Sequence, residues 1–169
     1  MTLLALLGAM MMATQVALAA LPNIHLVAVF VILAALLFGW KALFSIYIFV
    51  LLEGLIYGFS MWFVNYLYVW TVLTVIAILF RNNRSRWFWG ALAGIFGLLF
   101  GALCSIPYFF IGFVNGGMLS GMIMAFNWWI AGIPFDLIHC VFNFVLMFLL
   151  YRPMRNLMDR MKQNVYLRQ

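Results

Sequence analysis

Charged residues are scarce in this sequence. Of its 169 residues, 7% are charged and 69% are hydrophobic, with 9 basic and 3 acidic side chains. A soluble domain carries about 25% charged residues, so this chain lacks the polar surface that keeps a globular protein in water. The composition excludes a soluble globular fold and predicts an integral membrane protein.

Motifs of the common enzyme classes are also absent. Lys41 and Lys162 are the only lysines, and neither belongs to a Gly-x-x-x-x-Gly-Lys-Ser/Thr loop that would bind ATP. The sequence has no His-Glu-x-x-His zinc motif and no Gly-x-Ser-x-Gly nucleophile elbow. The two cysteines, Cys104 and Cys140, lie in apolar runs, where thiols act as small hydrophobic groups. We therefore expect no enzymatic activity, no metal site and no bound cofactor.

Apolar segments separated by polar breaks divide the chain into spans of about 20 residues, the length that a membrane helix needs. The expected spans are 3–20, 24–38, 42–59, 61–80, 90–111 and 128–151. No basic residue precedes the first segment, so we interpret it as a retained span and not as a signal peptide. Residues 112–127, rich in glycine and methionine, are expected to form a connection. We predict an all-α fold: a single six-helix membrane domain over residues 1–151 and a basic tail over 152–169.

All the basic residues fall on one side of these six spans. They are Lys41, Arg81, Arg84, Arg86, Arg152, Arg155, Arg160, Lys162 and Arg168. Lysine and arginine in short loops remain on the cytoplasmic side, so both termini are predicted to be cytoplasmic and the loops around Asn23, Ser60 and Asn115 to face outward. This topology and attraction to lipid headgroups explain the net charge of +6, so we infer no nucleic-acid partner.

Polar side chains within the spans gather in the predicted outer half. They include Gln15, Glu53, Tyr57, Asn65, Tyr66, Tyr68, Ser105 and Tyr108, with Asn23 and His25 at the outer rim. An ionisable side chain at bilayer depth costs about 2.5–3.5 kcal/mol, so it persists where it faces protein or a wet cavity. Glu53, Asp136 and His139 are therefore candidates for function.

The last span carries a polar stripe on one helical face. Gly132, Asp136, His139 and Asn143 follow one another at steps of four, three and four residues, which place them on the side that should face the bundle interior. Pro134 removes a backbone hydrogen bond and frees carbonyl groups for a neighbour or a ligand. The stripe either pairs with other helices or binds a ligand. Hydrogen-bonding groups of several spans at one depth, beside many aromatic rings, favour a pocket for a flat, partly polar molecule.

Small residues form two further stripes. In the first span they recur every four residues and make a smooth face, which serves either internal packing or docking to a partner subunit; they are Ala5, Ala9, Ala13 and Ala17. In the fifth span we expect them to serve internal packing; they are Gly90, Gly94, Gly97 and Gly101.

Taken together, these residues resemble the substrate-binding S components of energy-coupling factor (ECF) transporters, small six-helix membrane proteins that capture vitamins and related micronutrients. The resemblance covers essentially the whole chain. It rests on the alanine repeat, on Leu21-Pro22-Asn23-Ile24, on Glu53-Gly54-Leu55-Ile56-Tyr57-Gly58, and on Gly132-Ile133-Pro134-Phe135-Asp136-Leu137-Ile138-His139 with Asn143. Each motif is short, and their order together with the six-span size carries most of the weight.

The resemblance implies a multi-pass protein of the bacterial cytoplasmic membrane that works with partners. Ala5, Ala9 and Ala13 would dock to a transmembrane T component, which is coupled to two cytoplasmic ATPases that use the ATP. The substrate would lie in the outer half. The residues implied for substrate binding are Asn23, His25, Glu53, Tyr57, Asn65, Tyr68, Trp128, Asp136, His139 and Asn143.

The substrate itself stays open at this point. The Leu21–Ile24 and Glu53 segments look most like the cobalamin subgroup, whereas riboflavin, pantothenate or a queuosine precursor suits the aromatic residues about as well. Two other functions remain alternatives. One is an autonomous proton-coupled carrier that uses Glu53 and Asp136, and the other is a purely structural packing subunit.

Overall fold

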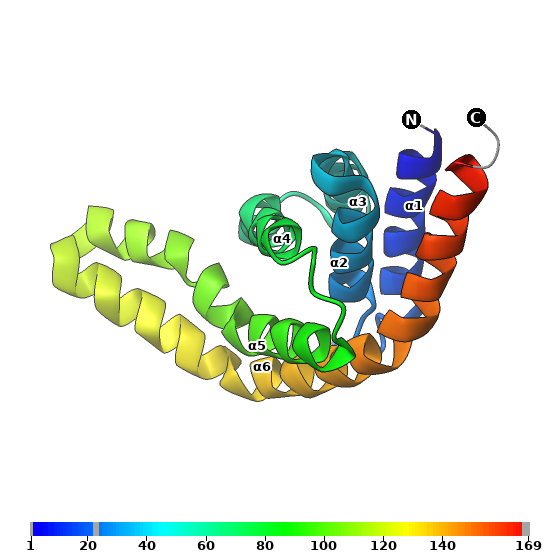
Figure 1. Cartoon of the computed structure of the whole chain (residues 1–169). Helices are drawn as coiled ribbons and strands as arrows, with labels where there is room; N and C mark the ends of the chain where they lie inside the picture. The colour runs from blue at the N-terminus through cyan, green and yellow to red at the C-terminus, as the bar shows by residue number, and fades with distance from the viewer. Residues whose placement is uncertain (1, 22–23, 167–169) are drawn as a thin grey trace.

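The computed structural model describes residues 2–21 and 24–166, with side chains up to residue 160, and every regular element in this part of the chain is helical. The all-α prediction is confirmed (Figure 1). The elements are α1 (Thr2–Ala17), α2 (Val27–Phe38), the 3₁₀ turn η1 (Gly39–Lys41), α3 (Ala42–Tyr57), α4 (Met61–Leu79), α5 (Arg86–Cys104) and α6 (Ile106–Tyr166).

Three stretches of the described helices are long and apolar enough to cross a membrane. They are Val27–Tyr57, Met61–Leu79 and Arg86–Arg160. The first contains α2, η1 and α3, and the last contains α5 and most of α6. Taken singly, α1 has 16 residues and α2 has 12, which rise about 24 and 18 Å against a hydrocarbon core of about 30 Å. The structure is compatible with a membrane protein, but helix length alone does not yield six full spans.

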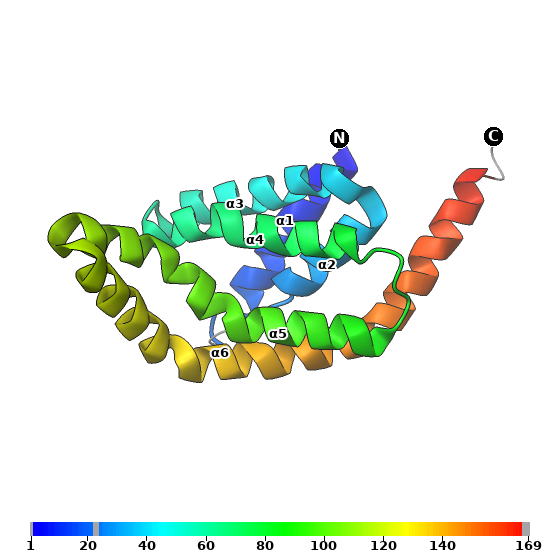
Figure 2. The same cartoon turned by 60° about the vertical axis from the view of Figure 1, so that its left-hand side comes forward.

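Residues 112–127 differ from the sequence prediction, because they are helical and not an open connection. Helical geometry is interrupted only at Gly116 and Gly117, and Gly117 has a φ of 77° that favours glycine. Gly112 packs closely on the returning segment, since a Cβ added there would lie 2.7 Å from the Ser120 carbonyl oxygen. The glycines therefore form a tight helical hairpin. This distal hairpin, residues 106–130, extends away from the other helices (Figures 1 and 2).

The core of the molecule surrounds α2. This helix is apolar on all sides, and it contacts α1, α3, α4 and α6, as expected for a helix without a polar face. Trp70 of α4 and Phe49 of α3 are fully buried beside it. The α1 and α3 helices pack closely because Gly8 leaves room for the backbone of Ser45.

The predicted packing role of the α5 glycines is confirmed. Gly90, Gly94, Gly97 and Gly101 all face α6, and a Cβ added to Gly97 would lie 2.8 Å from the backbone of His139. The α6 helix continues through Pro134, with non-helical backbone only at the hairpin tip. Pro134 therefore does not end the helix.

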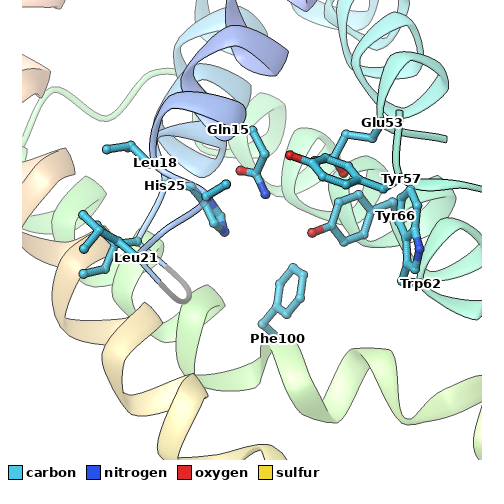
Figure 3. Close-up of a pocket in the computed structure, with 11 residues that line it drawn as sticks. Gln15, Leu18, Leu21, His25, Glu53, Tyr57, Trp62, Tyr66 and Phe100 are labelled. Atoms are coloured by element: carbon cyan, nitrogen blue, oxygen red, sulfur yellow. The ribbon is translucent and has the colours of Figure 1, made fainter. Parts of the chain in front are cut away.

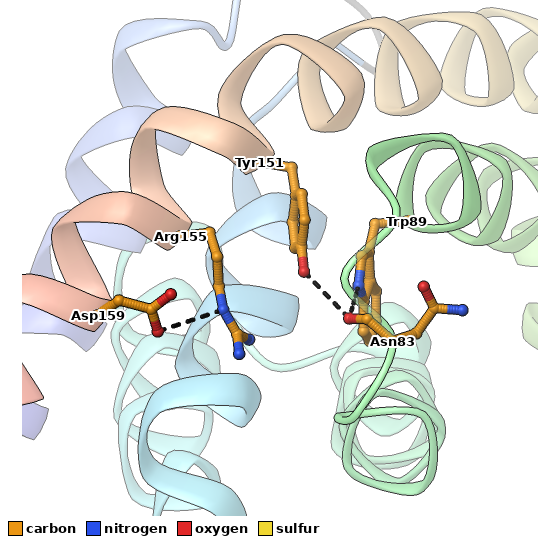
Figure 4. Close-up of polar contacts among 5 residues, drawn as sticks. All are labelled: Asn83, Trp89, Tyr151, Arg155 and Asp159. Atoms are coloured by element: carbon orange, nitrogen blue, oxygen red, sulfur yellow. Dashed lines mark hydrogen bonds and ion pairs between the residues drawn. The ribbon is translucent and has the colours of Figure 1, made fainter.

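The basic segments meet at one end of the molecule. The loop between α4 and α5 is fastened to α6, because the backbone carbonyl of Asn83 accepts hydrogen bonds from Trp89 Nε1 at 3.0 Å and from the Tyr151 hydroxyl at 3.1 Å (Figure 4). Beyond Tyr151, α6 continues to Tyr166, so the described part of the basic tail is helical, and Arg155 forms an ion pair with Asp159 at 3.5 Å. The turn η1, the α4–α5 loop and the end of α6 share the right-hand side of Figure 2.

Candidate ligand-binding site

A cavity of about 350 Å³ lies among the C-terminal ends of α1, α3 and α5 and the N-terminal ends of α2 and α4 (Figure 3). Its volume falls within the range of about 300–1,000 Å³ that is usual for small-molecule sites. The lining residues are Gln15, Leu18, Ala19, Leu21, Ile24, His25, Glu53, Tyr57, Trp62, Tyr66 and Phe100. The cavity therefore occupies the end of the helices that lies opposite the basic segments.

One side of this cavity is polar. The Gln15 amide, the His25 imidazole and the hydroxyl of Tyr66 point toward the same space (Figure 3). Glu53 is 3% exposed, and its carboxylate comes from the last turn and a half of α3. Within the described residues, Gln15 Oε1 and His25 Nδ1 are buried without a hydrogen-bond partner. A buried polar atom without a hydrogen-bond partner destabilises the fold by about 1–3 kcal/mol, so these atoms favour a polar ligand in the cavity.

The other side of the cavity is aromatic. Trp62 and Tyr66 lie one turn apart on α4, with ring centroids 5.4 Å apart and planes at 76°. Tyr66 meets Phe100 of α5 at 6.2 Å and 81°. Because these rings meet edge to face, flat aromatic surface remains beside the polar groups. This combination suits a planar molecule with hydrogen-bonding edges.

The α6 stripe reaches this cavity through His25. Asp136, His139 and Asn143 are all buried, so the prediction that this face points into the bundle is confirmed. The His25 and His139 rings lie 4.7 Å apart between centroids. In the part of the chain that the structure describes, His139 Nε2 and both amide atoms of Asn143 have no hydrogen-bond partner. His139 thus lies directly behind the lining, against His25 and Phe100, while Asn143 is buried farther along α6.

Other residues implied for substrate binding take part in contacts between helices. The carboxylate of Asp136 accepts the backbone N–H of Gly101, at 3.0 and 3.2 Å to its two oxygens, and so joins α6 to α5. The Tyr68 hydroxyl lies 2.6 Å from the Leu103 carbonyl oxygen and 3.2 Å from Asn65 Oδ1. The contact with Leu103 connects α4 with α5, and the contact with Asn65 lies within α4. None of these residues lines the cavity.

Trp128, another of the predicted residues, lies apart from the cavity. Trp128 stacks on Tyr108 within the distal hairpin, with centroids 4.7 Å apart and planes at 23°. Asn23 lies outside the described residues. Of the ten implied residues, the structure places His25, Glu53 and Tyr57 in the lining and His139 behind it.

Four lining residues are not among those implied for substrate binding, although two of them, Gln15 and Tyr66, belong to the polar set predicted in the outer half; the four are Gln15, Trp62, Tyr66 and Phe100. For three of them a signal existed. Gln15 is a polar residue near the end of a mostly apolar helix, and Trp62 and Tyr66 are spaced for one helical face. Phe100 carried no signal, because it is one of 18 phenylalanines in the chain.

The alanine stripe of α1 faces away from the rest of the chain. Ala5, Ala9 and Ala13 are exposed, whereas the opposite face, with Gly8 and Met11, packs inward. Internal packing, one of the two interpretations of this stripe, is therefore not what the structure shows. A smooth, uncovered helix face remains.

Comparison with known proteins gives no match, since no family model, no curated protein and no solved structure is similar to the chain. The functional argument therefore rests on the residues and geometry of the cavity.

Proposed function

We propose that this chain is the substrate-capture subunit of a membrane importer, of the ECF S-component type, and that it binds a small, flat and partly polar micronutrient. The observation that carries this proposal is the cavity itself. It combines buried polar atoms without partners, at Gln15 and His25, with the acidic group of Glu53 and the aromatic rings of Trp62 and Tyr66. Such a surface can hold a ligand by hydrogen bonds and stacking, without covalent chemistry.

In this proposal six membrane-embedded helices leave both termini in the cytoplasm of a bacterial cell. The gathering of Lys41, the α4–α5 loop and the end of α6 at one end supports this orientation, because arginine and lysine are retained inside. The cavity at the opposite end then opens outward. The short α1 and α2 would be accommodated by local thinning of the bilayer or by packing against partners.

The size of the cavity bears on the substrate. A corrinoid with its nucleotide is larger than a cavity of about 350 Å³ encloses, so the smaller candidates are favoured over cobalamin. Riboflavin, pantothenate and a queuosine precursor all carry the polar edges that Glu53, His25 and Gln15 would contact. Of these, the flat ring systems also use the aromatic wall.

Transport in this proposal depends on other chains. The exposed alanines of α1 support docking of Ala5, Ala9 and Ala13 to a T component, since small residues let two helices approach closely. ATP would be used by two partner ATPases, which fits the lack of an ATP-binding motif in this sequence.

The geometry favours capture over an autonomous proton-coupled carrier. That alternative needs Glu53 and Asp136 in one pathway, yet the Asp136 carboxylate is bound to Gly101 at the α5–α6 contact and does not line the cavity. The arrangement thus assigns Asp136 to helix packing.

One experiment separates these functions. The purified chain, without ATP or partners, is titrated with riboflavin, pantothenate, a queuosine precursor and cobalamin, and is also reconstituted alone into liposomes. We expect tight, saturable binding of one compound and no uptake. Uptake by the chain alone that is abolished by Glu53→Gln would establish the carrier instead. Absence of binding to the whole panel, in a folded preparation, would contradict capture.

A further inference from the structure

A second, entirely apolar groove lies between α4 and α5. Its volume is about 470 Å³, and it is lined by Val72, Ile76, Phe80, Phe88, Ala91, Leu92, Ile95, Phe96, Leu99 and Leu103. Ile95 is 58% exposed and Leu99 is 46% exposed, so the groove is open along the side of the molecule. In a membrane this side would face lipid.

Basic residues stand at one end of this groove. Phe80 and Phe88, whose rings lie 5.2 Å apart, mark that end, and the loop between them carries Arg81 and Arg84. Both arginines are exposed. The acidic residues of the chain are Glu53, Asp136 and Asp159, and within the described side chains the ion pair found is Arg155 with Asp159. Among the described side chains, neither Arg81 nor Arg84 forms an ion pair, so the loop presents positive charge.

The loop that carries these arginines is held in a fixed shape. Asn83 Oδ1 accepts the backbone N–H of Ser85 at 2.8 Å, and Ser85 Oγ caps α5 by accepting the N–H of Phe88 at 3.4 Å. The Asn83 carbonyl is bound by Trp89 and Tyr151 (Figure 4). Arg81 and Arg84 thus extend from a loop that is anchored on both α5 and α6.

We propose that this groove binds one acyl chain of an anionic phospholipid, whose phosphate is held by Arg81 and Arg84. Negative charge on the lipid complements the loop, and the groove offers the chain only apolar contacts. This inference rests on the membrane insertion in the proposed function and does not depend on the capture of a substrate.

The dimensions of the groove fit a lipid chain better than a protein helix. From Phe88 to Leu103, α5 rises about 23 Å. One leaflet makes up about half of the ~30 Å hydrocarbon core, so the groove is longer than one leaflet is thick. The volume of about 470 Å³ is spread along that length, so the groove is long and narrow. A single acyl chain has this shape, whereas an α-helix with its side chains is about 10–12 Å across.

The test is lipid competition measured by native mass spectrometry. The full chain in detergent receives equal amounts of phosphatidylglycerol and phosphatidylcholine with identical acyl chains. We expect bound phosphatidylglycerol to exceed phosphatidylcholine by about tenfold or more, since each arginine near a lipid surface contributes about fivefold. The double variant Arg81→Gln/Arg84→Gln should bring the ratio close to one.

Two further variants separate the parts of the site. Arg152→Gln/Arg160→Gln removes the same charge elsewhere and should retain the preference. Ala91→Trp should fill the groove and reduce binding of both lipids at least severalfold. The proposal would be overturned if both arginine double variants lost the preference for phosphatidylglycerol equally. A ratio of phosphatidylglycerol to phosphatidylcholine near one in the wild-type protein would also overturn it. A photo-crosslinker at Ile95 that captures a protein and no lipid in cells would also overturn it. Failure of substrate binding would leave these ratios unchanged, so the two proposals fail separately.

Discussion

The imidazole rings of His25 and His139 meet edge to face, with centroids 4.7 Å apart and planes at 62°. His25 precedes α2 and lines the cavity, whereas His139 lies on α6, 1% exposed, and also contacts the ring of Phe100 at 4.9 Å. This contact joins a cavity residue to the buried polar stripe of α6. A change on α6 can therefore reach the cavity through His25.

We expect His139→Ala to weaken ligand binding although His139 does not line the cavity. Loss of the ring removes the support of His25, and aromatic pairs contribute about 0.5–1.5 kcal/mol beyond their burial. A double-mutant cycle of His25→Ala and His139→Ala, read by isothermal titration with the molecule that co-purifies with the protein, should give a coupling energy of that size. Strictly additive effects would show that the contact has no role in the site.

Glu53→Gln should reduce affinity by about tenfold or more. A hydrogen bond to a charged group contributes about 1.5–3 kcal/mol, and the amide keeps the shape of the side chain while it loses the charge. Titration followed by intrinsic tryptophan fluorescence measures the change, since Trp62 lines the cavity. Asp159→Asn, which alters an acid on the surface of α6, is the matched control and should bind normally. Unchanged affinity in Glu53→Gln would remove this residue from the site.

Two glycine substitutions should differ sharply in stability. Gly97→Ala places a Cβ 2.8 Å from the backbone of His139, and such overpacking costs about 1–3 kcal/mol. Gly132→Ala meets no atom within 4 Å and lies within α6, so it should leave stability unchanged or slightly higher. Thermal unfolding in detergent, followed by circular dichroism, compares the two. Equal transition temperatures would contradict the close α5–α6 packing.

Ala9→Trp should prevent association with a T component and leave ligand affinity intact. A bulky ring on the exposed alanine face of α1 separates two helices that otherwise approach closely. Co-purification from cells that express the partner subunits measures association. Phe44→Trp, an exposed apolar position on α3, is the control and should retain the complex. Retained association of Ala9→Trp would place the interface on another surface.

Much of the fold follows from pattern in the sequence. The spacing of Asp136, His139 and Asn143 predicts their shared burial, and the glycines of α5 predict its tight contact with α6. These features are local, because helical periodicity alone decides which residues share a face. The separation of polar from basic segments also follows from the chain order of the helices.

The remaining features depend on long-range packing between helices, which the residue pattern of a single helix does not determine. Residues 112–127 are rich in glycine, which favours an open connection, yet Gly112 and Gly121 act as contact points within a hairpin. Asp136 is an ionisable residue within a predicted span, which favours a functional role, but its carboxylate accepts the Gly101 N–H of a neighbouring helix. Which polar residues reach the cavity is decided by how α1, α3 and α4 pack around it, and no single helix carries that information.

The most direct test of the central claim is cysteine accessibility at Tyr57, which lines the cavity and is 51% exposed. Cys104 and Cys140 are first replaced by alanine, and Tyr57→Cys is then treated in intact cells with a membrane-impermeant maleimide. An outward capture site predicts labelling from outside that is slowed by the ligand that co-purifies with the protein. Labelling only after the cells are permeabilised, or labelling that the ligand does not affect, would contradict it.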